Sequence, residues 1–516
     1  MQRHPHRSLK AGICFLVPLA ILLMGNPLRG APAEDRFAER LFKNGISLIR
    51  AGNQEHALQT FDELSRGFPN SPLADDALYR SGTLFYPASG LRSLHRAGRD
   101  SIARAIPYFQ RIQEEYTYSD TAPLALYKMA LLALESRNPG RSLDEAFARF
   151  SRLLALYPDS PVTDRALLGT AHVQSRMGEC GQAMNHLDRL LERFPESAAS
   201  TGALALSASC QADLEQWVPA MESLQELIDA QGNSLEGSQA RRFLTLIYRT
   251  RFLPSLGRQV PLVRDTAFET ETSKAGMRSC RGLAVGGNGR VYAGDPRQSF
   301  LWSFQEGGQP IGKSARPGGI RWVGLRGGEG ILTGNRGAVH RKTGVHALDR
   351  KGTPLLGIES VAISEDGTIF VLDSREEKIF LFDGNLAYQD ELLPPGEGRP
   401  VKIRNGPRRH LFLLTEAPSG LFRREADGGW REIPLEVEMT ETRPIDFAVD
   451  GVGNLYLLSR RGGPVLVFHP GGKLLVRLEM PSDPDRPRLI PGSLAVGPEG
   501  TIYLCGRKSD RIVRFR

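Results

Sequence analysis

The stretch VAISEDGTIFVLDSREEKIFLFD, residues 361–383, decides the fold of the C-terminal half of this chain. Its three apolar runs (VAI, IFVL and IFLF) are separated by SEDGT and DSREEK, which are rich in residues that favour tight turns. Short apolar runs joined by such turns predict antiparallel strands connected as hairpins.

The same strand–turn–strand pattern recurs through the C-terminal half. Clear copies begin at Gly282, Asp446 and Ser493, and weaker copies begin at Trp322 and Val401. Equivalent first-strand positions are 284, 324, 362, 404, 448 and 495, which are 38 to 47 residues apart. This period suits four-stranded sheets arranged around an axis and predicts a six-bladed β-propeller over residues 280–516. A seven-bladed ring and an incomplete ring remain alternatives.

The sixth copy lacks an outer strand, because the chain ends one residue after Ile512–Phe515. An open sheet edge is a liability in a propeller. We expect a segment within Gln259–Glu269 to supply the missing strand and close the ring. Residues 256–279 are therefore predicted to be a linker that includes this closing strand.

This half resembles the NHL-type and related six-bladed propellers, with residues 361–383 as its best match. The family has an acid two residues beyond the core of the second strand. Here that acid is kept as Asp295 and Asp373 only. The resemblance implies a propeller fold and binding surfaces on its faces.

Residues 34–255 have a helical period instead. The phrase FPNSPLADDALYRSG (68–82) recurs as YPDSPVTDRALLGTA (157–171) and, more weakly, at Tyr116 and Phe194. A second element, which begins with Ala57/Phe61/Leu64, recurs in phase at Ala105, Ala146, Ala183 and Ala220. Two-helix units of about this length predict a solenoid of about five to six helix pairs.

This region resembles the tetratricopeptide repeat family, especially bacterial envelope members such as the Tol–Pal coordinator and the barrel-assembly lipoprotein. The A-x-x-x-F…P order carries the resemblance, together with Gly45, Ala171 and Ala208 at the small position of the first helix. Extra residues around 86–101 and 138–140 depart from the family's repeat length. The resemblance implies protein partners in the cell envelope.

The N-terminus has the layout of a secretory signal. Basic residues precede the apolar run AGICFLVPLAILLM (11–24), and Ala31-Pro32-Ala33 offers a cleavage site. We therefore expect residues 1–33 to be a signal peptide, with an uncleaved inner-membrane anchor as the alternative. We therefore expect an exported protein that lies in the periplasm or at the outer membrane and has no membrane span after cleavage.

Four cysteines remain after the signal, and none forms a C-x-x-C pair, which disfavours structural zinc. Export permits disulfides. Cys180 and Cys210 lie at neighbouring ends of antiparallel helices, and Cys280 and Cys505 lie on blades that adjoin if the ring closes. Both pairs are candidate disulfides.

The sequence offers little for catalysis. No catalytic or phosphate-binding motif occurs, and the positions that face the predicted channel are apolar or basic, as at Arg281, Arg321 and Arg404, except for Glu359 and Asp446. Two acids are too few for a calcium cage. His340 and His346 are expected to be surface histidines. We predict no metal and no cofactor.

The net charge of +8 comes from 66 basic and 58 acidic residues without a polybasic block, and we predict no nucleic acid partner. We expect a non-enzymatic scaffold that binds proteins, and an envelope polymer as a further candidate partner. A propeller hydrolase or lyase with a helical targeting arm, and an assembly component of a secretion or polysaccharide-export machine, are the alternatives. The repeats are also expected to form a concave groove that binds a partner; in one alternative, Tyr79 and Tyr127 pack between repeats and do not face that partner. The residues expected to line the concave groove are Asp76, Tyr79, Tyr127, Arg165, His172 and Arg176.

Overall fold

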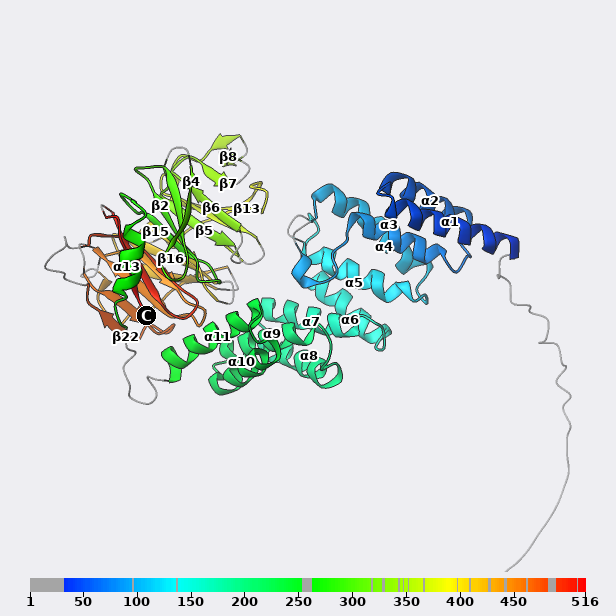
Figure 1. Cartoon of the computed structure of the whole chain (residues 1–516), viewed down its shortest axis with the longest axis horizontal. Helices are drawn as coiled ribbons and strands as arrows, with labels where there is room; N and C mark the ends of the chain where they lie inside the picture. Colours follow the sequence, from blue (N-terminus) through cyan, green and yellow to red (C-terminus); the bar gives the residue numbers. More distant parts are fainter. Residues whose placement is uncertain are drawn as a thin grey trace, which may run out of the picture. The chain divides into compact units, whose positions relative to one another are not determined.

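The computed structural model of the chain confirms the predicted fold class, a helical region followed by a six-bladed β-propeller (Figure 1). The signal-peptide prediction falls almost entirely on residues 1–31, outside the described residues. The structure describes residues 32–94, 97–135, 138–252, 262–316, 319–326, 330–341, 344–346, 348–350, 352–364, 367–396, 398–407, 410–425, 428–439, 443–460, 463–480, 489–507 and 509–516.

The helical region consists of consecutive helices that pair as the sequence repeat predicts. In the described part of the chain, no helix is both long and apolar enough to span a bilayer. The helices are α1 (Pro32–Arg50), α2 (Gln54–Gly67), α3 (Ala74–Phe85), the short 3-10 helix η1 (Leu91–Ser93), α4 (Arg99–Glu115), α5 (Thr121–Leu134), α6 (Leu143–Leu156), α7 (Thr163–Met177), α8 (Cys180–Arg193), α9 (Ser200–Asp213), α10 (Trp217–Gln231), α11 (Leu235–Ile247) and the π-helical η2 (Tyr248–Phe252).

Local sequence sets the helix ends. The side chains of Asn53, Ser142 and Ser234 accept hydrogen bonds from the first turns of α2, α6 and α11, which satisfies amides that have no partner within the helix. Gly178 ends α7 in the left-handed conformation. The repeated apolar residues Ala57 and Phe61 of α2, like their counterparts in later repeats, are fully buried.

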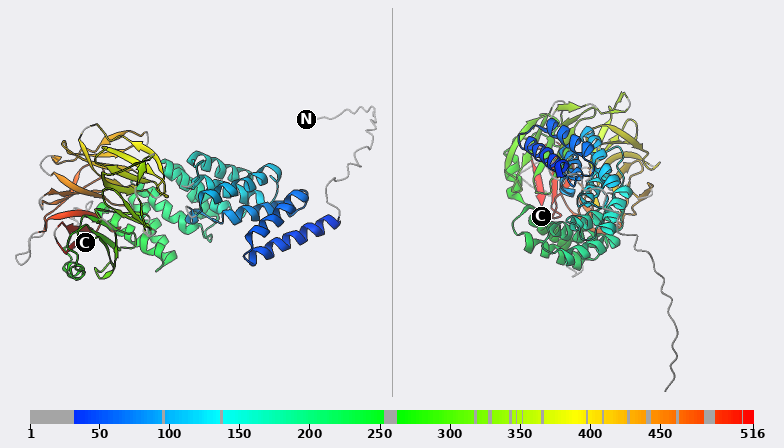
Figure 2. Two further views of the ribbon diagram at one scale, coloured as in Figure 1. Left: turned by 90° about the horizontal axis from the view of Figure 1, so that it is seen from above. Right: turned by 90° about the vertical axis from the view of Figure 1, so that its right-hand side faces the viewer.

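Glycines allow helices to approach closely at the crossing points. A methyl group at Gly45 would lie 2.5 Å from the ring of Phe61, and one at Gly169 would lie 2.5 Å from the ring of Phe150. These distances are far below van der Waals contact, so these positions tolerate no side chain without rearrangement. Helix α7 packs against α8, and α9 packs against α10, in the part of the helical region that is drawn in cyan to green in Figure 2.

The chain forms two compact units, one made of residues up to 85 together with 107–122, and the other made of 86–106 together with 123–516. Much of the predicted insertion between α3 and α4 belongs to the second unit. There Tyr86 is buried and donates its hydroxyl to Glu135 at 2.8 Å, and Lys128 donates to the carbonyl of Ala88. Burial, with a smaller contribution from Arg165, lowers the pKa of Lys128 to about 8.

The propeller contains six antiparallel sheets in chain order, and each of the first five has four strands. A small extra hairpin, β9 (Asp349–Arg350) with β10 (Thr353–Pro354), lies between the second and third sheets. The blades are β1–β4 (Gly282–Val285, Val291–Asp295, Phe300–Phe304, Pro310–Ala315), β5–β8 (Trp322–Arg326, Gly330–Gly334, Val339–Arg341, Gly344–His346), β11–β14 (Ile358–Ile363, Ile369–Asp373, Lys378–Phe382, Tyr388–Leu392), β15–β18 (Arg399–Asn405, Leu411–Glu416, Gly420–Arg424, Trp430–Glu432), β19–β22 (Pro444–Val449, Leu455–Ser459, Val465–Phe468, Leu474–Leu478) and β23–β25 (Pro491–Val496, Ile502–Gly506, Ile512–Phe515).

The ring is closed. Each first strand contacts the first strand of the next blade, from β1 through β5, β11, β15 and β19 to β23, and β23 contacts β1 again. The register repeats as well, because the first-strand position Ala284, like Ala362 and Ala448, pairs with an aromatic residue of the second strand. A seventh blade therefore has no place between β23 and β1.

The short segment Val263–Asp265 lies along the outer edge of β25. The amide of Val263 and the carbonyl of Arg516 are hydrogen-bonded at 2.9 Å, and the amide of Asp265 donates to the carbonyl of Arg514 at 2.9 Å. The segment expected from the sequence thus pairs with β25 over three residues, and residues 259–261 of it lie outside the described residues. The chain then turns into helix α13 (Thr266–Ser273).

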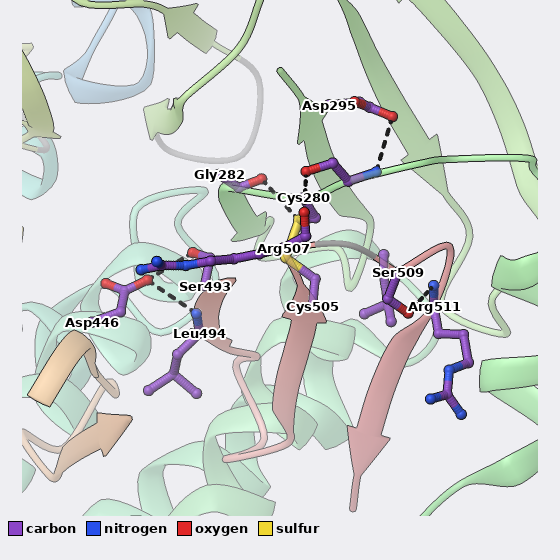
Figure 3. Close-up of a disulfide and its surroundings, with 12 residues drawn as sticks. Cys280, Gly282, Asp295, Asp446, Ser493, Leu494, Cys505, Arg507, Ser509 and Arg511 are labelled. Atoms are coloured by element: carbon purple, nitrogen blue, oxygen red, sulfur yellow. Dashed lines mark hydrogen bonds between the residues drawn. A yellow bond between two sulfur atoms is a disulfide. The ribbon is translucent and has the colours of Figure 1, made fainter. Parts of the chain in front are cut away.

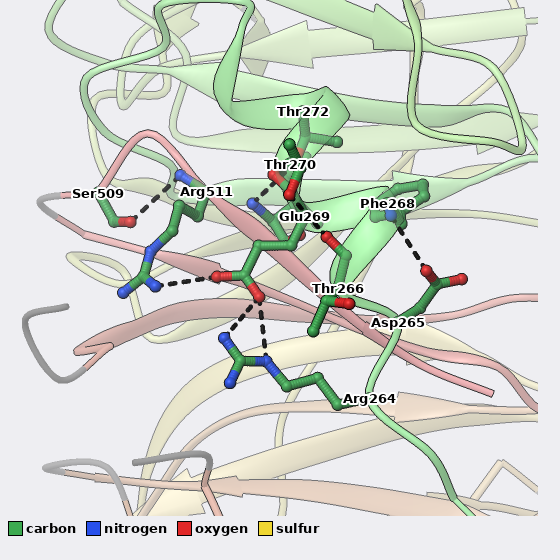
Figure 4. Close-up of polar contacts among 10 residues, drawn as sticks. Arg264, Asp265, Thr266, Phe268, Glu269, Thr270, Thr272, Ser509 and Arg511 are labelled. Atoms are coloured by element: carbon green, nitrogen blue, oxygen red, sulfur yellow. Dashed lines mark hydrogen bonds and ion pairs between the residues drawn. The ribbon is translucent and has the colours of Figure 1, made fainter. Parts of the chain in front are cut away.

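Helix α13 is fastened to the last strand by buried ion pairs (Figure 4). Glu269, which is 1% exposed, accepts from Arg264 at 2.7 Å and from Arg511 at 2.9 Å. Asp265 caps the helix by accepting from the amide of Phe268, and it also pairs with Arg514. The contacts of Arg511 with Glu269 and of Arg514 with Asp265 join residues more than 240 positions apart and hold the sixth blade to the start of the first.

Candidate functional site

Two of the predicted groove residues, Asp76 and Tyr79, lie on α3 in the first unit, and both are half-buried. The ring of Tyr79 packs against Phe109, with centroids 5.9 Å apart. Burial, and then the neighbouring Asp75 and Asp120, raise the pKa of Asp76. Asp76 is therefore a carboxyl group in an acidic surrounding that would be stabilised by a cationic partner.

Tyr127, on α5 in the second unit, is 3% exposed. Its ring packs against Phe150 with centroids 5.8 Å apart, and the guanidinium of Arg165 lies 5.5 Å from the ring centroid. Tyr127 is thus held between α5, α6 and α7, and its place agrees with the alternative in which the tyrosine packs between repeats. It offers almost no surface to a partner.

The other three predicted groove residues, Arg165, His172 and Arg176, lie along α7 and are half-buried. Their spacings of seven and four place them on one side of the helix. Arg165 also donates to the carbonyl of Pro161 at 3.2 Å, which helps to fix its direction. These residues are called the α7 face below.

Charged residues lie around the axis of the propeller, where the first strands meet. One position of the first strand repeats in every blade, and in five blades it carries alanine or glycine. In the fourth blade it carries Arg404, which pairs with Phe412 of the second strand. Arg404 donates to the carboxylate of Asp446 at 2.9 Å and to the carbonyl of Phe447 at 3.1 Å. Lys402 lies 3.9 Å from the same carboxylate.

Asp446 is 1% exposed and has its hydrogen-bonding capacity filled by the protein. Ser493 donates its hydroxyl to it at 2.7 Å, and the amide of Leu494 donates at 3.0 Å. Burial alone would raise the pKa of Asp446, but Lys402, Arg404 and these hydrogen bonds outweigh it and hold the pKa below its ordinary value. Asp446 is a structural anion whose positive neighbours surround it.

The second acid of the axis, Glu359, pairs with Arg336 at 3.5 Å. Among the residues that the structure describes, no group of three or more His, Cys, Asp and Glu side chains is arranged to hold a metal ion. His340 was expected at the surface, and this prediction is wrong: it lies on β7 and is 1% exposed. The sequence obscures this burial because His340 lies in a stretch rich in glycine and basic residues, GNRGAVHRKTGVH (334–346).

The candidate cysteine pairs differ in the structure. A disulfide joins Cys280, just before β1, to Cys505 in β24, with an S–S distance of 2.01 Å (Figure 3). It links the first and sixth blades. Cys180, at the start of α8, and Cys210, in α9, are both buried and are not joined by a disulfide. Their proximity, followed by burial, raises the pKa of Cys180.

The end of the helical region contacts the propeller within the second unit, at a junction that no sequence motif marks. Arg242 of α11 pairs with Glu306 at 2.6 Å, in the turn between β3 and β4. Arg251 donates to the carbonyl of Val452 at 3.2 Å. Val452 also belongs to the apolar cluster formed by α9, α10 and α11. The helical region therefore contacts one face of the propeller. This face is formed by the turns that join the first to the second strand, and the third to the fourth strand, of the blades.

A pocket of about 280 Å³ lies at this junction. It is lined by Trp217, Arg251, His410 and His469 among others, and Arg251 lies 4.9 Å from the ring centroid of Trp217. Burial, and then Arg251, lower the pKa of His469. No short motif marks these residues, because they come together from positions up to about 250 residues apart.

The family model described as "Tetratricopeptide repeat" matches residues 124–160 and 165–197, which cover α5–α6 and α7–α8. No curated protein sequence matches the chain.

Several solved structures resemble parts of the chain. Virginiamycin B lyase from Staphylococcus aureus is 13% identical over 46% of this chain and 80% of its own, with a TM-score of 0.36. A gluconolactonase from Xanthomonas campestris is 13% identical over 46% and 86%, with a TM-score of 0.34. A tetratricopeptide repeat protein from Parabacteroides merdae is 16% identical over 41% and 73%, with a TM-score of 0.33. With the matched repeats and the six sheets, the chain is a protein of tetratricopeptide repeats followed by a six-bladed β-propeller.

Proposed function

We propose that this protein is an exported, non-catalytic scaffold of the bacterial cell envelope that binds protein partners. The observation that carries the proposal is the α7 face, since Arg165, His172 and Arg176 lie on one side of a helix within a matched tetratricopeptide repeat. Two half-buried arginines and a histidine on a repeat helix suit an extended segment or a helix of another protein.

Export is supported by the basic and apolar layout of residues 1–33 and by the disulfide between Cys280 and Cys505. Disulfides persist in oxidising compartments such as the periplasm. The periplasm or the outer membrane is the proposed location, and the partners are proposed to be envelope proteins.

The absence of catalysis is part of the same proposal. Asp446, the most buried charged group at the axis, is saturated by Arg404, Ser493 and Leu494, so its carboxylate has little capacity left for a substrate or a proton transfer.

The test is site-specific crosslinking in the native envelope. A photo-crosslinking residue at His172 reports on the α7 face, and one at Arg189, which is exposed on α8, is the matched control. We expect a specific protein to be captured from position 172 and not from position 189, as read by mass spectrometry. Equal capture at both positions, or none at position 172 together with hydrolase or lyase turnover by the purified protein, would contradict the proposal.

A further inference from the structure

The face of the propeller opposite the helical junction carries an unusual set of arginines. It is formed by the turns between the second and third strands of each blade, and we call it the distal face. In four of these turns the chain places an exposed arginine: Arg297, Arg336, Arg460 and Arg507. They belong to blades one, two, five and six, which are neighbours in the closed ring.

Blades three and four interrupt this pattern. The turn of blade three carries Arg375, but Glu376 and Glu377 follow it directly, and the turn of blade four begins after Glu416. In contrast, the described residues of the four arginine-bearing turns include a single acid, Asp510. The positive charge is therefore concentrated in an arc from blade five through six and one to blade two.

Residues nearer the axis extend the arc inward. Arg281 and Arg321 stand directly before the first strands β1 and β5, and the Arg507 side chain points from β24 toward Asp446 (Figure 3). Lys402 has 12% of its side chain exposed. We call Arg281, Arg297, Arg321, Arg336, Arg443, Arg460 and Arg507 the arginine arc.

The inner cations of the arc are close enough to repel one another. Burial lowers the pKa of Arg321, and Arg281 and Arg336 lower it further against the opposing effect of Glu359. Burial likewise lowers the pKa of Lys402, and Arg404 and Arg507 lower it further against the opposing effects of Asp446 and Glu359. The acids in reach are already engaged, Asp446 by Arg404 and Glu359 by Arg336. A bound anion would relieve this repulsion.

A hollow lies at one end of the arc. Arg443 and Arg460 line a pocket of about 430 Å³ together with residues 416–419 and Pro444. Its acid, Glu416, pairs with Arg399 at 2.7 Å and lies 4.0 Å from Arg460 through its other carboxylate oxygen. The two arginines thus face a concave surface in which an anionic group can be accepted by paired guanidinium donors.

From this arrangement we infer that the arginine arc binds a linear acidic polysaccharide, whose carboxylate groups follow the arc across four blades. A chain suits the arc better than a flat lipid surface, because Arg321 is half-buried and Lys402 is almost covered, so that only a narrow ligand reaches them. The choice of a polysaccharide as the ligand rests on the export proposed above. The positions of the arginines in the arc do not depend on that proposal.

The experiment compares two double variants of the mature protein that lose the same charge. R297Q/R507Q removes two arginines of the arc. R290Q/R375Q removes two exposed arginines outside it, one on the opposite face and one beside Glu376 and Glu377. Binding of polygalacturonate is measured by isothermal titration calorimetry at about 150 mM salt, with neutral dextran as the polymer control.

We expect R297Q/R507Q to weaken binding of polygalacturonate by about tenfold or more, and R290Q/R375Q by less than about twofold. Dextran should not bind. Equal losses in the two variants, or no binding of polygalacturonate by the unaltered protein, would overturn the inference. Tighter binding of anionic phospholipid vesicles or of polyphosphate than of polygalacturonate would overturn the choice of polysaccharide. The crosslinking of position 172 is a separate readout, so failure of the scaffold proposal and failure of this inference are distinguishable.

Discussion

At the residue scale, the two halves of the protein depend on opposite properties of single side chains. In the helical region, what matters is the missing side chain of Gly169, which lets α7 approach the ring of Phe150. In the propeller, what matters is the buried polar side chain of His340. Its two ring nitrogens have no hydrogen-bond partner among the described residues. Both residues can be tested by substitution.

Gly169→Ala should destabilise the protein although alanine is the better helix former. The added methyl would lie 2.5 Å from Phe150, and such overpacking costs about 1–3 kcal/mol, more than the roughly 1 kcal/mol gained in helix propensity. Gly181→Ala is the control, because that glycine is exposed on α8 with no atom within 4 Å of the new methyl. Urea denaturation followed by circular dichroism should show a lower midpoint for the first and an unchanged or higher one for the second.

His340 should make the propeller less stable in mild acid. Burial, and then Arg316, lower its pKa in the folded protein below its ordinary value. Its contribution to stability is therefore present above the ordinary histidine pKa and is lost as the pH falls through the folded value. Denaturation followed by tryptophan fluorescence at pH 7.5 and 5.5 should show this loss, and His340→Leu should reduce it. His56→Gln, at an exposed site, should leave the loss unchanged; equal pH dependence in all three proteins would refute the assignment.

At the element scale, the repeats explain most of what the sequence could predict. Ala57 and Phe61 recur with the period of a helix pair, and Ala284 and Ala362 recur with the period of a blade, so helices, strands and ring size follow from spacing. Features that occur once follow no period. The junction between Arg251 and Val452 depends on contacts between distant positions, which spacing does not encode. The arginine arc would have been visible had the turns of different blades been aligned.

Helix α13 is a single element on which ring closure depends. Asp265→Ala should cost about 2–4 kcal/mol, because it removes both the cap of α13 and the buried partner of Arg514. Ser234→Ala is the matched control, since Ser234 caps α11 without an ion pair, and it should cost about 1 kcal/mol. The two losses are compared by denaturant titration. A loss for Asp265→Ala no larger than that for Ser234→Ala would show that the ion pair contributes nothing.

At the scale of the whole molecule, three different contacts close the same ring. The first strand β1 contacts β23, the segment Val263–Asp265 lies along β25, and the disulfide joins Cys280 to Cys505. The strand contact and the disulfide join the first and sixth blades directly, and the segment Val263–Asp265 covers the outer edge of the sixth.

Removal of the disulfide should therefore weaken the propeller markedly. The bridge encloses a sequence separation of 225 residues, and loss of such a long-range crosslink costs about 2–5 kcal/mol. C280A/C505A should unfold at clearly lower denaturant concentration than C180A/C210A, which also removes two buried cysteine side chains but no bond. A reducing agent should lower the midpoint of the unaltered protein and leave that of C280A/C505A in place. Indistinguishable midpoints for the two double variants would argue against the bridge.

The bridge between Cys280 and Cys505 also has a mechanical meaning for a scaffold. When a partner on the repeats and a load on the C-terminus pull the protein in opposite directions, tension enters the propeller before β1 and leaves it after β24. The covalent shortcut carries that force past the strands between Cys280 and Cys505, so this part of the propeller is not stretched. In an oxidising compartment the propeller would thus keep its shape under pulling, and reduction would convert it from a rigid link into an extensible one.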